Sequence, residues 1–453
     1  MGVWLGGKLY DLNGDYTLVW WIGVGIGAFS AIVHLPGDPP LPPPIQPLHL
    51  CSPVRAPLGG GRRMRAGIVC LVLAYVLSQF YRAFLAVLTP VLKSELGATA
   101  EDLAAASGLW FLAFALMQLP VGWALDHIGP RLTSAVLLAV GGGGGALVFA
   151  TAQGPGAISL AMALIGIGCA PVLMAAYYIF ARIYSPAVFG TLAGAVIGIG
   201  SLGNIAGSLP LAWTVEAFGW RETLFALAAV TLSTAAAIAL LVRDPARPEG
   251  GARGSVLDLL RMPALWPVLI MMVVCYAPAA GLRGLWIGPY YTDVFAASAA
   301  QIGAATLVMG LAMVAGNFAY GPLDRALGTR KGVILGGNLA TAACLLALWA
   351  FPTAGGLGTL ALFAGIGLFG ASFPMVIAHG RAFVPPQLMG RGVTLLNFFG
   401  LGAAGVAQFV TGRIHHAAPA TPPEAPYAAL FLFFALALLA GCAVYAFAQD
   451  RTD

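Results

Sequence analysis

Two arginines stand inside long apolar stretches of the sequence, Arg82 within SQFYRAFLAV and Arg283 within YAPAAGLRGLWIGPYY. If these stretches cross a lipid bilayer, a charged side chain there is costly and normally faces a cavity. A guanidinium group offers paired N–H donors that match the oxygens of carboxylates and phosphates. Together the two arginines therefore favour a binding site for a small anion. The alternative is that each one snorkels to the membrane surface or binds backbone carbonyls.

The composition is that of a membrane protein. Of the 453 residues, 60% are hydrophobic and only 9% are charged, and the mean hydropathy is +0.89. Soluble domains carry about 25% charged residues. A membrane-spanning helix needs about 20 apolar residues, and the 60 glycines of this chain suit close helix packing in lipid. We therefore expect an all-α membrane protein with many spans.

From Ala66 onward, apolar segments alternate with short polar connections, and the pattern predicts twelve helices. They are expected at about 66–92, 102–125, 131–152, 156–182, 187–214, 220–242, 264–291, 299–323, 331–351, 356–383, 388–414 and 426–448. The polar stretch Arg243–Arg261 divides them into two sets of six. The expected domains are an N-terminal six-helix bundle at 65–243, a central loop at 244–262, and a C-terminal six-helix bundle with a short tail at 263–453. Arg82 and Arg283 lie at matching depths in the first helix of each bundle.

Basic residues are distributed unequally between alternate connections. One set of connections carries Lys93, Arg221 and Arg413. The other set carries fifteen: Arg62, Arg63, Arg65, Arg131, Arg182, Arg243, Arg247, Arg253, Arg261, Arg325, Arg330, Lys331, Arg381, Arg391 and Arg451. The positive-inside rule places the richer set in the cytoplasm. We therefore expect an integral protein of the plasma membrane, the inner membrane in a bacterium, with both ends of the twelve-helix unit in the cytoplasm.

The connection between the second and third helices has a recognisable pattern. It reads PVGWALDHIGPR, and Gly122, Asp126, Gly129 and Arg131 give G-x-x-x-D-x-x-G-x-R. This pattern resembles the signature loop of the major facilitator superfamily. The resemblance implies two six-helix bundles, a substrate site midway across the membrane between them, and transport by alternating access. It also implies that Asp126 and Arg131 hold the cytoplasmic ends of the first bundle together in the outward-open state.

A second copy of the pattern lies in the second set of helices, at YGPLDRALGTRK. Gly321 and Gly328 keep the spacing of the two glycines in the first copy. The acid, Asp324, follows its glycine by three positions instead of four, and Arg325 occupies the shifted place. Because this spacing is broken, we expect the second copy to matter less for gating.

Residues 1–36 precede the regular pattern and contain one apolar run, Tyr16–Leu35. This segment is similar to the last helix of a second transporter of the same superfamily, and it predicts one extra N-terminal helix. Residues 37–64 form a proline-rich linker, which is expected to be extended. A chain that starts at Met64 is expected to be a working transporter.

Polar and aromatic side chains in the other helices would complete the anion site. The candidates for contact with the substrate are Tyr81, Tyr177, Tyr276, Trp286 and Asn317, with Asn204 as a further polar neighbour. A pair of arginines in the first helix of each bundle resembles the layout of the organophosphate/phosphate antiporters. Aromatic residues at membrane depth are, however, more often packing or interface residues.

No Asp or Glu lies at mid-depth in any expected helix, and His379 is the only histidine expected within one. This pattern favours exchange, uniport or a proton that travels with the substrate, so the partners are a small anionic solute, the lipid bilayer, and protons or a counter-substrate. The alternative is a multidrug or metabolite efflux transporter of the same fold, although such proteins often use mid-membrane acids. An enzyme is not expected, because the sequence contains no HExxH or GxSxG motif.

Neither a cofactor nor a metal is expected. The six cysteines are scattered and form no CxxC pair. The net charge of +5 follows the membrane topology and does not indicate a nucleic-acid partner.

Overall fold

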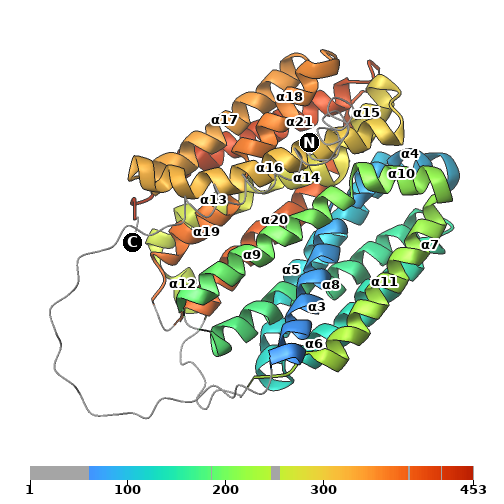
Figure 1. Ribbon diagram of the computed structural model, residues 1–453. Helices are drawn as coiled ribbons and strands as arrows, with labels where there is room; N and C mark the ends of the chain where they lie inside the picture. Colours follow the sequence, from blue (N-terminus) through green and yellow to red (C-terminus); the bar gives the residue numbers. More distant parts are fainter. Residues whose placement is uncertain (1–60, 185, 246–255, 386–387, 420, 452–453) are drawn as a thin grey trace, which may run out of the picture. The chain divides into compact units, whose positions relative to one another are not determined.

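A computed structural model describes residues 61–184, 186–245, 256–385, 388–419 and 421–451 (Figure 1). The chain divides into two compact units, Met1–Leu58 and Gly59–Asp453, and the described residues all belong to the second. In these described ranges the secondary structure is entirely helical. The expected N-terminal helix and most of the proline-rich linker lie outside the described residues.

The helices fall into a first half and a second half, joined by the segment 242–255. The first half contains α3 (Gly61–Phe80), α4 (Phe84–Leu96), α5 (Ala100–His127), α6 (Pro130–Leu137), η1 (Leu138–Gly143), α7 (Gly144–Ala150), α8 (Pro155–Ile183), α9 (Pro186–Ala206), α10 (Leu209–Phe218) and α11 (Trp220–Leu241). The second half contains α12 (Val256–Leu260), η2 (Pro263–Leu265), α13 (Trp266–Cys275), α14 (Ala277–Gly281), η3 (Leu282–Trp286), α15 (Ile287–Phe295), α16 (Ala299–Leu327), α17 (Arg330–Ala350), α18 (Gly356–Phe369), α19 (Phe373–Arg381), α20 (Met389–Ala417) and α21 (Ala425–Tyr445).

Ten helices of the described ranges are long and apolar enough to cross a membrane, or up to 12 if each of two bent pairs counts as one span. The bent pairs are Ala66–Phe80 with Phe84–Leu96, at 47°, and Ala195–Ala206 with Leu209–Phe218, at 41°. The outer surface carries large exposed apolar side chains, such as Val69, Trp123 and Leu240, which suit lipid contact. The predicted all-α membrane fold is therefore confirmed, with spans close to the expected ones.

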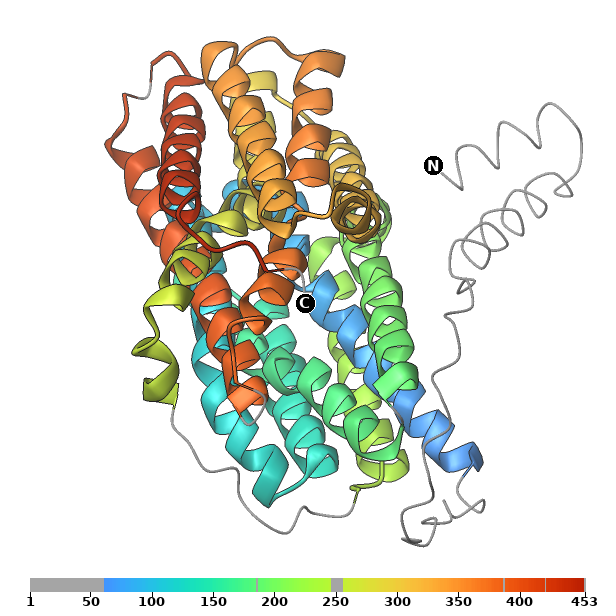
Figure 2. The ribbon, with the colours of Figure 1, turned by 90° about the vertical axis from the view of Figure 1, so that its left-hand side faces the viewer.

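The two bends pack against each other. Pro210 cannot donate a backbone hydrogen bond, so the α9 ladder is interrupted before α10. At this break a Cβ placed on Gly207 would lie 3.0 Å from the Phe80 carbonyl oxygen and 3.3 Å from Ala83 Cβ. The absence of a side chain at Gly207 thus brings the α9–α10 break onto the turn that joins α3 and α4, next to Arg82. In Figure 2 the blue α3 runs beside the green α9.

Close contacts join the two halves along several helix pairs, among them α5 with α20, α4 with α15, and α10 with α16. Gly108 of α5 and Gly405 of α20 face each other, because a Cβ on either would lie 3.0 Å from the carbonyl oxygen of the other. Small residues of this kind let two backbones approach within a membrane. The bundle has one end near Lys93, at the ends of α4 and α15, and another near Arg131, at the start of α6. We refer to them as the Lys93 end and the Arg131 end.

Candidate functional site

Arg82 and Arg283 meet where the two halves are in contact. Arg82 lies in the irregular turn 81–83 between α3 and α4, and Arg283 lies in the π-helical turn η3. A Cβ placed on Gly284 would lie 2.8 Å from the Arg82 carbonyl oxygen, so the two backbones touch at this point. Single π turns within helices occur frequently at functional sites.

The Arg283 side chain is almost completely buried, with 3% of its surface exposed. It donates a hydrogen bond from one terminal nitrogen to Asn204 Oδ1, at 2.8 Å. Its Nε is buried and has no hydrogen-bond partner among the described residues. Asn204 belongs to α9 in the first half, so this bond crosses between the halves. A neutral amide leaves the positive charge of Arg283 uncompensated.

Arg82 is half-buried and is held by aromatic rings. Its guanidinium carbon lies 5.1 Å from the centre of the Trp110 ring and 4.9 Å from that of Phe114. Both distances fit cation–π attraction. The Arg82 Nε, like that of Arg283, is buried without a hydrogen-bond partner. Of the ion pairs among the described residues, none includes Arg82 or Arg283.

The aromatic candidates fall in different places. Tyr276 lies between α13 and α14 and packs on Phe373, with ring centres 4.7 Å apart. Trp286 is buried, and its Nε1 donates to side chains of α20 at 3.0 and 3.1 Å. The Tyr81 hydroxyl shares a 2.9 Å hydrogen bond with Thr231 inside the first half.

The remaining candidates are Tyr177 and Asn317. Tyr177 is half-buried on α8 against the core of the first half. Asn317 is exposed on α16, about two turns past Gly310, and a Cβ on Gly310 would lie 3.9 Å from Arg283 Cδ. The structure therefore brings Arg82, Arg283 and Asn204 together. Tyr81 and Trp286 have their polar groups directed to packing partners.

The first copy of the signature loop holds the helices of the first half together at the Arg131 end. Asp126 pairs with Arg182 of α8 at 3.7 Å. The Arg131 side chain donates to the Ala239 carbonyl oxygen at 2.6 Å, and its backbone N–H donates to Asp244 Oδ1 at 2.8 Å. These contacts connect the start of α6 to the end of α11.

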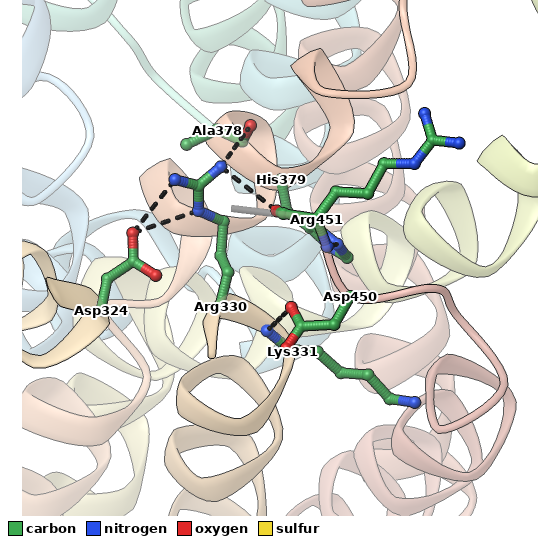
Figure 3. Close-up of polar contacts among 7 residues, drawn as sticks. All are labelled: Asp324, Arg330, Lys331, Ala378, His379, Asp450 and Arg451. Carbon is green, nitrogen blue, oxygen red and sulfur yellow. Dashed lines mark hydrogen bonds and ion pairs between the residues drawn. The ribbon is translucent and has the colours of Figure 1, made fainter. Parts of the chain in front are cut away.

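The second copy forms a tighter pair than its spacing predicts (Figure 3). Two nitrogens of Arg330 reach Asp324 Oδ2, each at 3.1 Å. The side chains of Asp324 and Arg330 are 13% and 14% exposed, whereas that of Asp126 is 58% exposed. Arg330 follows Gly328 by two positions, as Arg131 follows Gly129. Arg325, which occupies the place that the acid has in the first copy, is exposed, and Arg330 makes the pair with Asp324.

The C-terminal tail caps the second copy in the way that Asp244 caps the first. Asp450 accepts a hydrogen bond from the Lys331 N–H at 2.9 Å (Figure 3). It accepts another from the Thr329 hydroxyl at 2.6 Å. Partial burial raises the pKa of the Asp450 carboxyl, but these hydrogen bonds outweigh it, and its pKa lies below the ordinary value. His379 also binds the tail, because one ring nitrogen contacts the Tyr445 hydroxyl at 2.5 Å and the other the Gln449 carbonyl oxygen at 3.0 Å.

The Lys93 end carries ion pairs that cross between the halves. Lys93 of α4 contacts Asp293 of α15 at 2.5 Å, and Asp293 also accepts a hydrogen bond from Tyr427. Glu101 of α5 lies 3.2 Å from His416 of α20. The helix α20 continues to Ala417 and therefore includes His415 and His416.

Comparison with known proteins indicates a family. The family model of the Major Facilitator Superfamily matches residues 71–287, slightly less than half of the chain. Over this range the chain resembles the major facilitator superfamily. Its fold is similar to that of a mutant of the nucleoside transporter NupG, with a TM-score of 0.68 and 14% identity over 84% of this chain and 99% of that chain. The D-xylose–proton symporter matches with a TM-score of 0.68 and 13% identity over 85% of this chain and 98% of that one.

Two further proteins are similar to this chain. One is a bacterial homologue of the human lysosomal transporter Spinster, solved in an inward-facing, unoccupied conformation, with a TM-score of 0.63 and 16% identity over 86% of this chain and 98% of that one. The other is the probable sulfoacetate transporter SauU of Cupriavidus necator, which is 27% identical over 184 residues. That match covers 40% of this chain and 42% of the relative, so the chain spans about two fifths of the relative's length.

Proposed function

We propose that this protein is a secondary active transporter of a small anion, which binds between Arg82 and Arg283. The observation that carries the proposal is that the backbones at Arg82 and Gly284, next to Arg283, touch at the contact between the halves, and that no ion pair among the described residues includes either arginine. A buried positive charge without a counter-ion is costly, and an anionic solute would lower that cost. Each guanidinium has N–H donors to spare for the oxygens of a carboxylate, sulfonate or phosphate.

The relatives support this substrate class to different degrees. Sulfoacetate, named for the relative SauU, carries a sulfonate and a carboxylate, which two arginines would suit. The structural neighbours are named for nucleosides and D-xylose, so the fold itself is compatible with neutral solutes. The anion assignment therefore rests on the two arginines of this chain.

Alternating access would act on the two ends of the bundle. With the basic connections in the cytoplasm, the Arg131 end is the cytoplasmic end. The ion pair between Lys93 and Asp293 then closes the outer end, as expected for an inward-facing conformer. In the outward-facing conformer, Asp126 and Arg131 would hold the cytoplasmic ends together. Asp126→Asn should then shift the protein toward the conformer described here and slow turnover, with little change in substrate affinity.

The substrate proposal is tested by direct binding of an anion panel containing sulfoacetate, phosphate, nitrate and simple carboxylates. Loss of a charge-assisted hydrogen bond costs about 1.5–3 kcal/mol, which is about 10- to 150-fold in affinity. Arg82→Gln and Arg283→Gln should each weaken binding by that amount, and Arg→Lys should recover only part of it. Arg413→Gln, which removes an exposed arginine of α20, is the matched control and should bind normally. Wild-type affinity in Arg82→Gln or Arg283→Gln would remove that arginine from the site.

A further inference from the structure

Asn204 supplies the hydrogen-bond acceptor of Arg283 from the opposite half of the molecule. A guanidinium group only donates, so the amide oxygen of Asn204 must face it, as the 2.8 Å contact shows. The position of Asn204 is fixed by its neighbours on α9. A Cβ on Gly203 would meet the backbone of Val76, and the Ser208 hydroxyl donates to the Asn204 carbonyl oxygen at 3.3 Å. The amide is therefore held against η3 by the packing of α9 on α3.

The chemistry of this partner separates two possible roles. An aspartate at this position would neutralise Arg283 and compete with any anion for the same charge. A neutral amide accepts one hydrogen bond from Arg283 and leaves the charge available, so an anion can displace it. If residue 204 offered no acceptor, the Arg283 guanidinium of the empty protein would lose this hydrogen bond. Water could not easily replace it, because only 3% of the Arg283 surface is exposed. Asparagine thus stabilises the empty site without blocking it.

The two arginines differ in what holds them. Arg82 is half-buried and lies against the Trp110 and Phe114 rings, which do not occupy its N–H donors. Arg283 is more deeply buried and already has a polar partner. An entering anion can therefore bind Arg82 first and then take Arg283 from Asn204.

We propose that Asn204 is a positioning residue that occupies Arg283 in the empty transporter and lets the protein change conformation without an anion. This inference rests on the proposed anion site. A carrier whose empty site is satisfied can return unloaded, so it catalyses net transport. A carrier whose empty site leaves a buried charge without an acceptor is confined to exchange of one anion for another, since only the loaded form crosses between conformers easily.

The test compares net uptake with exchange in proteoliposomes that contain the full chain, with sulfoacetate as the probe. In Asn204→Ala, net uptake into empty vesicles should fall about tenfold or more relative to exchange between loaded vesicles, the factor expected for one lost charge-assisted hydrogen bond. Affinity for sulfoacetate should stay the same or increase, because the competitor for Arg283 is gone. Asn204→Asp should lose sulfoacetate binding, and Asn204→Gln, which keeps the amide oxygen, should retain part of the net uptake.

Ser201→Ala is the matched control on the same helix, because the Ser201 hydroxyl bonds only to the Ile197 carbonyl oxygen of its own turn. Thermal unfolding in detergent checks that each variant is folded. An unchanged ratio of net uptake to exchange in Asn204→Ala overturns the inference, and so does a wild type that performs exchange alone.

A separate readout distinguishes this inference from the anion proposal. Spin labels at Glu216 and Leu357, which are exposed on different halves at the Lys93 end, report the conformers of the empty protein. Asn204→Ala should shift their distance distribution away from the present conformer without any ligand. If the wild type binds no anion of the panel, the proposed function fails, and this distribution still decides the role of Asn204. An unaltered distribution would overturn it.

Discussion

The two ends of the bundle use their ion pairs differently. At the Lys93 end, Lys93 with Asp293 and Glu101 with His416 each join one half to the other. At the Arg131 end, the pair formed by Asp126 lies within the first half, and the pair formed by Asp324 lies within the second. The former pairs must break when the halves part at that end, whereas the latter remain intact.

Ion pairs that cross between the halves and ion pairs within one half therefore have different roles. The cross-half ion pairs at the Lys93 end change the balance between conformers, because they break when that end opens. Pairs within a half stabilise that half, so their loss lowers the free energy of unfolding; Asp126 has the further proposed role of holding the cytoplasmic ends together in the outward-facing conformer. We therefore expect charge substitutions at the Lys93 end to change mainly the balance between conformers. Charge substitutions at the Arg131 end should change mainly the free energy of unfolding.

The largest effect on stability is expected at Asp324. Its pair with Arg330 is mostly buried, so Asp324→Asn leaves a buried guanidinium without its anionic partner. Hydrogen bonds to charged groups contribute about 1.5–3 kcal/mol, and the free energy of unfolding should fall by about 2 kcal/mol. Asp126→Asn should cost less than about 1 kcal/mol, because Asp126 is mostly exposed and its contact is longer. Thermal and denaturant unfolding in detergent measure both.

Arg325→Gln is the control for this region, since it removes an exposed charge next to Asp324 and should leave unfolding unchanged. Equal losses for Asp324→Asn and Asp126→Asn would show that burial does not distinguish the two copies. A shift between conformers in Asp324→Asn without any loss of stability would contradict the assignment of this pair to one half.

The next largest effect is expected at the cross-half pair. Lys93 and Asp293 are 30% and 28% exposed, so the pair lies near the upper limit for surface ion pairs, about 1 kcal/mol. Lys93→Glu replaces this attraction with repulsion and should open the Lys93 end about five- to tenfold more often, without loss of thermal stability. Spin labels at Glu216 and Leu357 report the opening.

A charge exchange tests the same pair with its own control. Lys93→Asp combined with Asp293→Lys restores opposite charges across the halves. It should restore much of the closed population, although Tyr427 loses its acceptor. If the single and the exchanged variants opened equally often, the ion pair would not be what closes this end.

Much of the fold could be predicted from sequence because apolar length and basic-residue asymmetry are properties of single segments. The bends at 81–83 and 207–208 could not, since only Pro210 marks one of them and the other depends on packing between α9 and α3. The end of α20 was placed too early, because its last turn carries polar histidines. Hydropathy underestimates the length of a helix when its polar last turn is covered by the opposite half of the protein.

The site could be predicted only where one residue carried the signal. Arg82 and Arg283 stand out because charge at membrane depth is rare. Asn204 was one of several polar neighbours. Only its hydrogen bond to Arg283 across the halves distinguishes it from the others. Arg330 and Asp450 were missed, since their pairing depends on where the C-terminal tail returns. The sequence does contain a signal for the tail, because an acid follows the last helix of each half, at Asp244 and Asp450.

A smaller effect on stability, with a defined pH dependence, is expected for Asp450. Its carboxylate accepts from the first turn of α17, as a capping residue does, and Asp450→Asn should cost about 1 kcal/mol. Because the pKa of Asp450 is lowered in the folded protein, its stabilisation is fully present above the ordinary aspartate pKa of about 3.9. It is lost as the pH falls through the lowered value. Unfolding at pH 7 and pH 3 should therefore differ less in Asp450→Asn than in the wild type.

The smallest effect is expected for Glu101 and His416, whose side chains are 43% and 75% exposed. This pair is ionic only when the imidazole is protonated. Acidification from pH 8 to pH 5 should therefore close the Lys93 end further, by about twofold or less for so exposed a pair. The charged and titratable groups around the neighbouring His415 are Asp293, Lys93, His416 and Glu101.

His416→Gln should remove this pH response in the distance between labels at Glu216 and Leu357, and Glu101→Gln should remove it equally. Lys93→Gln should shift the distribution at every pH while the pH response remains, because the pair of Lys93 with Asp293 contains no histidine. A response that persists in His416→Gln would transfer the effect to His415, which is packed between the Trp286 and Tyr427 rings. The pH response at the Lys93 end would then come from a half-buried imidazole within the second half.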